Sequence, residues 1–88
     1  MIQIFKRRPL EFEVVRWDSY PETHKIVSEW TRASGQNIRL NISTGDLYLT
    51  TLEGGVCARP GDFIIRGIEG EVYPVIERRF RALYDEVL

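Results

Sequence analysis

The chain has 88 residues, of which 43% are hydrophobic and 28% are charged, a balance typical of a globular protein rather than a disordered one. Twelve Lys and Arg stand against thirteen Asp and Glu, and this formal charge of -1 argues against a general binder of nucleic acid. One cysteine and one histidine exclude an internal disulfide and a His/Cys metal site. No apolar run approaches the roughly 20 residues of a membrane span, and no signal-peptide core follows Met1. We therefore expect one cytosolic domain over residues 1–88, with no membrane partner.

The first predicted element is a strand over residues 10–17. Apolar Leu10, Phe12 and Val14 alternate there with acidic residues, as expected for a strand with one buried face.

A helix over about residues 20–34 should follow. Ser19 is a good N-cap and Glu22 completes a capping-box pattern, while Gly35 is a plausible residue to end the helix. The apolar positions at helical spacing are Ile26, Val27, Trp30 and Ala33.

The rest of the chain predicts an antiparallel meander closed by a short helix. Gly and Pro separate short alternating segments, and the period changes to that of a helix near the C-terminus. The positions expected to be buried in the strands include Ile38, Leu40, Ile42, Leu47 and Leu49, and those on the final helix are Phe80, Leu83, Tyr84 and Val87.

The sum is an α+β fold. We expect one small curved antiparallel sheet of about five or six strands, resembling a half-barrel, with one main helix and a short C-terminal helix. Edge strands of such a sheet offer a route to self-association, so we expect a homo-oligomer.

Three carboxylates bracket one predicted hairpin. Asp62, Glu69 and Glu71 could hold a divalent cation for a small hydrolase or phosphodiesterase. The favoured interpretation is structural: Asp62 caps a turn, and Arg66 forms an ion pair with Glu71 across the hairpin.

Cysteine–histidine catalysis is a poor hypothesis for this chain. Nothing in the sequence places His24 near Cys57, and a thiolate nucleophile needs a neighbouring base. Cys57 is expected to be a buried strand residue and His24 a solvated one.

Two basic clusters near the ends of the chain give the best functional lead. If the termini lie close together, the clusters form one positive patch that can grip phosphates, with Trp17 and Tyr73 as stacking surfaces. The alternative is that neighbouring acidic residues neutralise the patch. The arginines concerned are Arg7, Arg8, Arg78, Arg79 and Arg81.

Residues 59–74 read Arg-Pro-Gly-Asp-Phe-Ile-Ile-Arg-Gly-Ile-Glu-Gly-Glu-Val-Tyr-Pro. This stretch resembles a family of small proteins encoded by bacteriophages and prophages. The hallmark of that family is Pro-Gly-Asp-aromatic, a short strand, a Gly-x-x-Gly-Glu turn and Tyr-Pro. Phe80, Tyr84 and Asp85 match the positions that follow the hallmark.

The resemblance extends to residues 7–17 but fails at residues 75–79, where members often carry Lys-Pro-Asp, so the ligand of this chain is expected to differ. It implies a viral or prophage origin and the cytoplasm of a bacterial host, and it points to no particular reaction. We expect no cofactor.

By analogy with other small phage proteins, we expect a non-enzymatic binding protein. It would inhibit a host defence system by binding a host protein or by sequestering a small anionic nucleotide. The alternatives are the metal-dependent hydrolase and a component of virion assembly.

Overall fold

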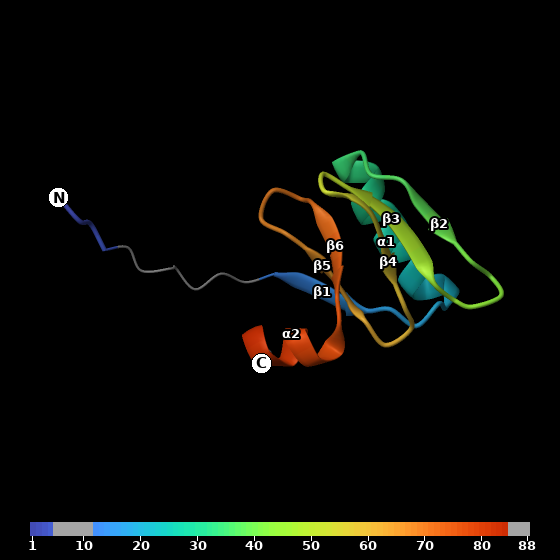
Figure 1. Ribbon diagram of the computed structural model, residues 1–88. Helices are drawn as coiled ribbons and strands as arrows, with labels where there is room; N and C mark the ends of the chain where they lie inside the picture. The colour runs from blue at the N-terminus through green and yellow to red at the C-terminus, as the bar shows by residue number, and fades with distance from the viewer. Residues whose placement is uncertain (5–11, 85–88) are drawn as a thin grey trace.

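The computed structural model describes residues 1–4 and 12–84. Within them, two helices and six strands form an α+β fold with two separate three-stranded antiparallel sheets (Figure 1). In chain order the elements are β1 (Glu13–Arg16), α1 (Pro21–Ser34), β2 (Ile38–Leu40), β3 (Leu47–Thr51), β4 (Gly54–Ala58), β5 (Phe63–Arg66), β6 (Val72–Val75) and α2 (Glu77–Leu83).

The predicted fold class is confirmed, but the single sheet resembling a half-barrel is wrong. The strand orders are β1-β5-β6 and β2-β3-β4, and neither sheet is closed or strongly curled. β4 lies beside β6 without joining it. The outer edge of β6 is unavailable because the Gln36 side chain bonds both the N–H and the C=O of Val72, at 2.8 and 2.7 Å, and because Pro74 has no N–H.

The main helix has nearly the predicted bounds, but it starts without the predicted cap. Tyr20 is the N-cap residue and makes no side-chain cap, while Ser19 has a φ of 65°, outside the extended conformation that N-caps normally adopt. The Asp18 carboxylate instead accepts the Tyr20 N–H at 2.9 Å. The predicted end is confirmed, since Gly35 is left-handed with a φ of 77°.

The buried stripe of α1 is narrower than its sequence predicts. Val27, Trp30 and Thr31 are buried, whereas Ile26 is 39% exposed and Ala33 is also exposed. A helix packed against so small a sheet buries one narrow stripe, and the Thr31 hydroxyl fits inside it by donating to the Val27 carbonyl at 2.9 Å.

The main core lies between α1 and the facing sides of the two sheets. Leu47 and Leu49 are buried as predicted, but Ile42 is 90% exposed. β2 ends at Leu40 because the Asn41 side chain accepts backbone N–H groups of the next turn. The buried members of the core are Trp17, Val27, Trp30, Leu47, Leu49, Ala58, Ile64 and Val72.

The predicted short C-terminal helix is confirmed as α2. Val87, which was predicted to lie on this helix, is outside the described residues, and so are Leu10 and Glu11 of the first predicted strand. α2 packs across the β1-β5-β6 sheet rather than on α1 (Figure 1). Neither of the two helices in the described part of the chain combines the length and the apolar character that crossing a bilayer requires.

Candidate binding surface at α2 and β6

A column of aromatic rings fixes α2 on the sheet. Phe80 of α2 stacks on Phe63 of β5 with ring centroids 4.1 Å apart and planes 12° apart. Tyr84 continues the column at 5.1 Å from Phe80, and Phe12 meets Tyr84 edge-on at 5.8 Å. Stacked and edge-to-face pairs of this kind add to the stabilisation from burial. A seven-residue helix is too short to be stable alone, so these contacts determine where its arginines lie.

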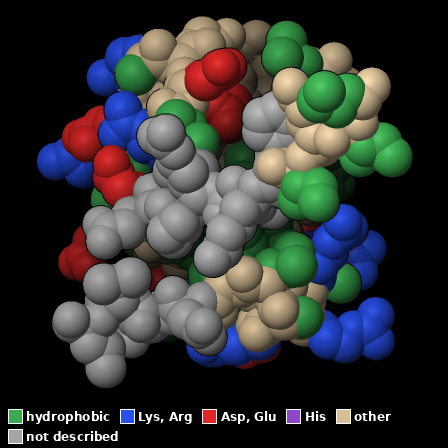
Figure 2. Space-filling model, turned by 90° about the vertical axis from the view of Figure 1, so that its left-hand side faces the viewer, with side chains coloured by type: hydrophobic (Ala, Val, Ile, Leu, Met, Phe, Trp, Pro, Cys, Tyr) green, Lys and Arg blue, Asp and Glu red, His purple; other side chains and the backbone are tan. Residues whose placement is uncertain are grey.

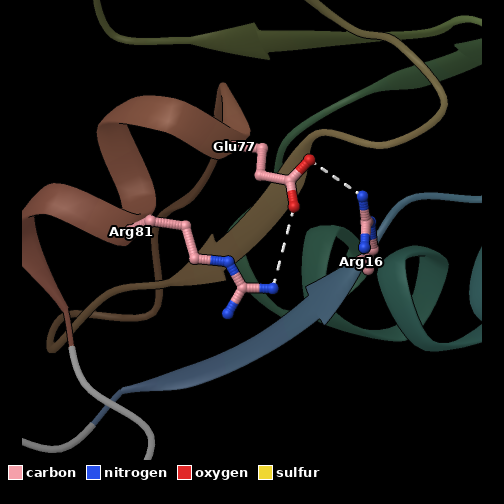
Figure 3. A network of polar contacts seen from close by, with 3 residues as sticks. All are labelled: Arg16, Glu77 and Arg81. Carbon is pink, nitrogen blue, oxygen red and sulfur yellow. Dashed lines mark hydrogen bonds and ion pairs between the residues drawn. The ribbon is translucent and has the colours of Figure 1, made fainter.

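Two arginines share one carboxylate beside this column. Arg16 at the end of β1 donates to one oxygen of Glu77 at 2.9 Å, and Arg81 lies 3.7 Å from the other (Figure 3). Both guanidinium groups also sit over the Phe63 ring, at 5.6 and 5.3 Å from its centroid. The trio is about half exposed, so we assign it mainly to positioning the first turn of α2.

A groove of about 450 Å³ lies between β6 and α2. Its walls are mainly apolar, with two tyrosines and one cation, a composition typical of a small-ligand site. The lining residues are Tyr73, Pro74, Val75, Ile76, Arg79, Leu83 and Tyr84.

Arg78 and Arg79 are the cations of α2 that remain available. Both are exposed, and neither has an ion-pair or stacking partner within the described residues. Helical spacing puts Arg79 and Leu83 on the side of α2 that faces the groove, about 100° from Arg78. The groove therefore has one cation, Arg79, in its wall.

The structure brings together some of the predicted site residues and removes one. Tyr73 and Arg79 line the same groove, Arg78 is an exposed residue of α2 outside the lining, and Arg81 forms an ion pair with Glu77. Arg7 and Arg8 lie outside the described residues. On the face in Figure 2 the visible Lys and Arg side chains lie toward the outline of the molecule, with hydrophobic, acidic and other side chains between them.

Trp17 is wrong as a stacking surface. Its exposed fraction is 0%, because the indole packs in the main core and its N–H donates to the Gly45 carbonyl at 2.7 Å. No ligand ring can reach it without unfolding the protein.

Sequence reasoning missed the part that Arg16, Glu77 and Phe63 play in positioning the site. The register that places Arg16 opposite Phe63 is the signal that identifies them, and it requires knowing that β1 pairs with β5, a strand about half the chain away.

The three carboxylates of the hydrolase hypothesis do not converge. Asp62 lies before β5, and Glu69 and Glu71 lie beyond its other end, separated by a strand about 13 Å long. Asp62 caps its turn as predicted, accepting the Arg59 N–H at 2.9 Å, and Glu71 accepts the Glu69 N–H at 3.1 Å. Arg66 forms its ion pair with Glu13 rather than with Glu71. Among the described residues no group of three His, Cys, Asp or Glu side chains could hold a metal ion.

We accordingly expect Mn²⁺ or Mg²⁺ to leave the melting temperature unchanged, since a ligand stabilises a protein only by binding the folded state. Thermal denaturation with and without each ion measures this. A rise in melting temperature that disappears in Glu71→Gln would restore the hydrolase hypothesis.

Cys57 and His24 form no catalytic pair. Cys57 is half-buried on β4, and burial raises the pKa of its thiol, with Asp46 raising it further. The thiol therefore stays protonated, which disfavours a nucleophilic role. His24 is half-buried rather than solvated, with its ring 6.3 Å from that of Trp17 and Nδ1 3.4 Å from the Ser28 hydroxyl.

Neither models of known protein families, nor curated proteins, nor solved structures give a match to this chain.

Proposed function

We propose that this chain is a non-enzymatic binding protein that takes an anionic ligand in the groove between β6 and α2. The observation that carries the proposal is the placement of Arg79 in the wall of a largely apolar groove. Arg79 is not neutralised by a carboxylate of the described residues. A guanidinium can form paired, charge-assisted hydrogen bonds with a ligand phosphate or carboxylate.

The groove has the chemistry for an anion that also carries a flat or apolar part. Pro74, Val75 and Leu83 offer aliphatic contacts, and Tyr73 and Tyr84 are the aromatic residues of the lining. Its volume of about 450 Å³ falls within the range typical of small-molecule sites. Together these features support a small anionic nucleotide as the ligand. A host protein that presents an acidic side chain next to an apolar one is the other class that fits.

The resemblance of residues 59–74 to phage proteins supports a biological setting for this binding. In that setting the protein is made in the cytoplasm of an infected bacterium and inhibits a host defence system, by sequestering a nucleotide signal or by occupying a host protein. Within the described residues no three His, Cys, Asp or Glu side chains come together to hold a metal ion, and the pKa of the Cys57 thiol is raised; both observations favour binding over catalysis.

Reversing the charge of Arg79 is expected to abolish ligand binding without unfolding the protein. Arg79 is exposed, so Arg79→Glu removes only its attraction to the anion. The protein is purified gently from a bacterial host and examined by native mass spectrometry, which reports any retained nucleotide-sized mass. If the protein is bare, the same variants are compared in pull-downs from host lysate.

Lys25→Glu is the matched control. Lys25 is an exposed cation on α1, which contributes nothing to the lining of the groove. The ligand or captured protein should persist in Lys25→Glu and disappear in Arg79→Glu. Equal retention by wild type and Arg79→Glu would overturn the proposal.

A further inference from the structure

The edges of the two sheets differ in whether they can pair with another strand. Each three-stranded sheet has two edge strands, which are β1 and β6 in one sheet and β2 and β4 in the other. β6 is closed by Gln36 and Pro74, and β4 lies beside β6. Within residues 1–4 and 12–84, no strand pairs with the outer edge of β1 or of β2.

The hydrogen-bond pattern defines which backbone groups these open edges present. Directly after β1, the Trp17 N–H donates to the backbone carbonyl of Asp62, the residue before β5. Because the direction alternates, the backbone N–H and C=O groups of Glu13 and Val15 also point toward β5. Val14 therefore points its N–H and C=O groups outward, because these directions alternate along an antiparallel strand, and continuing the alternation one residue before β1 gives Phe12 the same direction.

The same argument applies to β2. The Asn37 carbonyl accepts the Thr50 N–H, and the Asn41 N–H donates to the Asp46 carbonyl. The backbone N–H and C=O groups of Arg39, midway between Asn37 and Asn41, therefore point toward β3 as well. Ile38 and Leu40 consequently point their backbone groups outward.

Charge disfavours the register of each edge in which the strand pairs with itself about its charged residue. Centring two β2 strands on each other sets Arg39 directly opposite Arg39 of a second copy. One of the β1 registers likewise sets Glu13 opposite Glu13. Like charges directly opposite destabilise an antiparallel pair.

Pairing β1 with β2 gives the complementary arrangement. When Glu13 stands opposite Arg39 of a second copy, Val14 stands opposite its Ile38 and Phe12 opposite its Leu40. The outward backbone groups then match, with two hydrogen bonds for each of the two apolar pairs. Glu13 and Arg39 are exposed, and the four apolar residues are only partly buried, so both kinds of contact gain from pairing.

We propose that β1 of one copy of this chain adds to the open edge of β2 of a second copy in this register. The contact is heterologous, since each copy keeps a free β1 or a free β2, and it therefore builds a ring or an open filament rather than a closed twofold dimer. Neither strand lines the groove between β6 and α2, so this assembly is independent of ligand binding.

Exchanging the paired charges tests the register. Analytical ultracentrifugation of wild type should show a mass that rises with concentration in the micromolar range. Glu13→Arg and Arg39→Glu should each give monomers, because each sets like charges opposite one another, and the double variant should assemble again. Glu69→Arg is the matched control, an equal charge reversal at an exposed loop residue, and it should assemble as wild type does.

Proline substitutions test the two edges separately. Val14→Pro and Leu40→Pro each remove an N–H that points out of the sheet, so each blocks one edge without removing a hydrogen bond inside the protein. Alone, each variant should be a monomer. Mixed, they should form a heterodimer that cannot grow, because one retains an open β2 and the other an open β1.

A wild type that stays monomeric throughout the concentration range overturns the proposal. Failure of the double charge variant to assemble when both single variants are folded also overturns it. Circular dichroism of each variant establishes that it is folded. If these variants lose assembly but retain the ligand, the groove proposal is unaffected. If Arg79→Glu loses the ligand but still assembles, the strand-pairing proposal is unaffected.

Discussion

Trp17→Ala is expected to destabilise the protein by about 3–5 kcal/mol, the range for truncating a fully buried aromatic side chain. The Trp17 indole is completely buried at the junction of the two sheets and α1. Its N–H also satisfies the Gly45 carbonyl at 2.7 Å. An 88-residue domain has a total stability of about 4–13 kcal/mol, so this single change removes a large part of it. Urea denaturation followed by circular dichroism measures the loss.

Trp17→Phe and Trp30→Phe form a matched pair that separates packing from hydrogen bonding. Both replace a buried indole by a smaller ring, but the Trp30 indole makes no hydrogen bond within the described residues. Trp17→Phe should therefore cost more than Trp30→Phe, by about 1–3 kcal/mol for the carbonyl left without its donor. Equal losses in the two variants would show that the bond to Gly45 contributes nothing to stability.

Gln36→Leu is expected to destabilise the protein by about 2–5 kcal/mol. The Gln36 amide bonds both backbone groups of Val72, at 2.8 and 2.7 Å, and donates to the Thr50 carbonyl at 2.7 Å. Val72 is only 1% exposed, so leucine leaves its N–H and C=O without partners in a buried setting. Each such group costs about 1–3 kcal/mol.

Asn37→Leu is the control for Gln36→Leu. Asn37 is the next residue and also carries a side-chain amide, but it is exposed, and within the described residues its hydrogen bonds are made by its backbone N–H and C=O. It should change the free energy of unfolding by less than about 0.5 kcal/mol. Hydrogen exchange gives a local readout, because the Val72 amide should lose protection in Gln36→Leu. An unchanged exchange rate at Val72 would contradict the role assigned to the Gln36 side chain.

Gln36 also explains why the sheet topology escaped prediction. The alternation of apolar residues identifies the strands after α1, and all of them exist. Alternation does not reveal which edges pair, because any two strands with one apolar face satisfy it equally well. A single side chain that takes both hydrogen-bonding groups of Val72, together with Pro74, decides that β6 ends one sheet and leaves β4 to end the other.

The candidate site was predictable in part. Tyr73, Arg78 and Arg79 were predicted from residue type and cluster, and of these Tyr73 and Arg79 line the groove, while their part in binding stays a prediction. Trp17 was wrong because residue type does not tell a stacking surface from a core indole. The groove itself arises where α2 crosses β6, and that crossing depends on the stack of Phe80 on Phe63.

The residue pattern is sufficient to define most of the local structure of this protein. The period of its apolar residues defined both helices and most strand positions, Gly35 ended α1, and Asp62 capped its turn. These features depend on interactions between residues a few positions apart, which a linear pattern records. Only the tertiary structure decided that Trp17 is buried, that Arg16 meets Glu77, and that two small sheets replace one curved sheet. Those outcomes depend on contacts between distant segments, where several partners have the same chemistry and only packing in three dimensions selects among them.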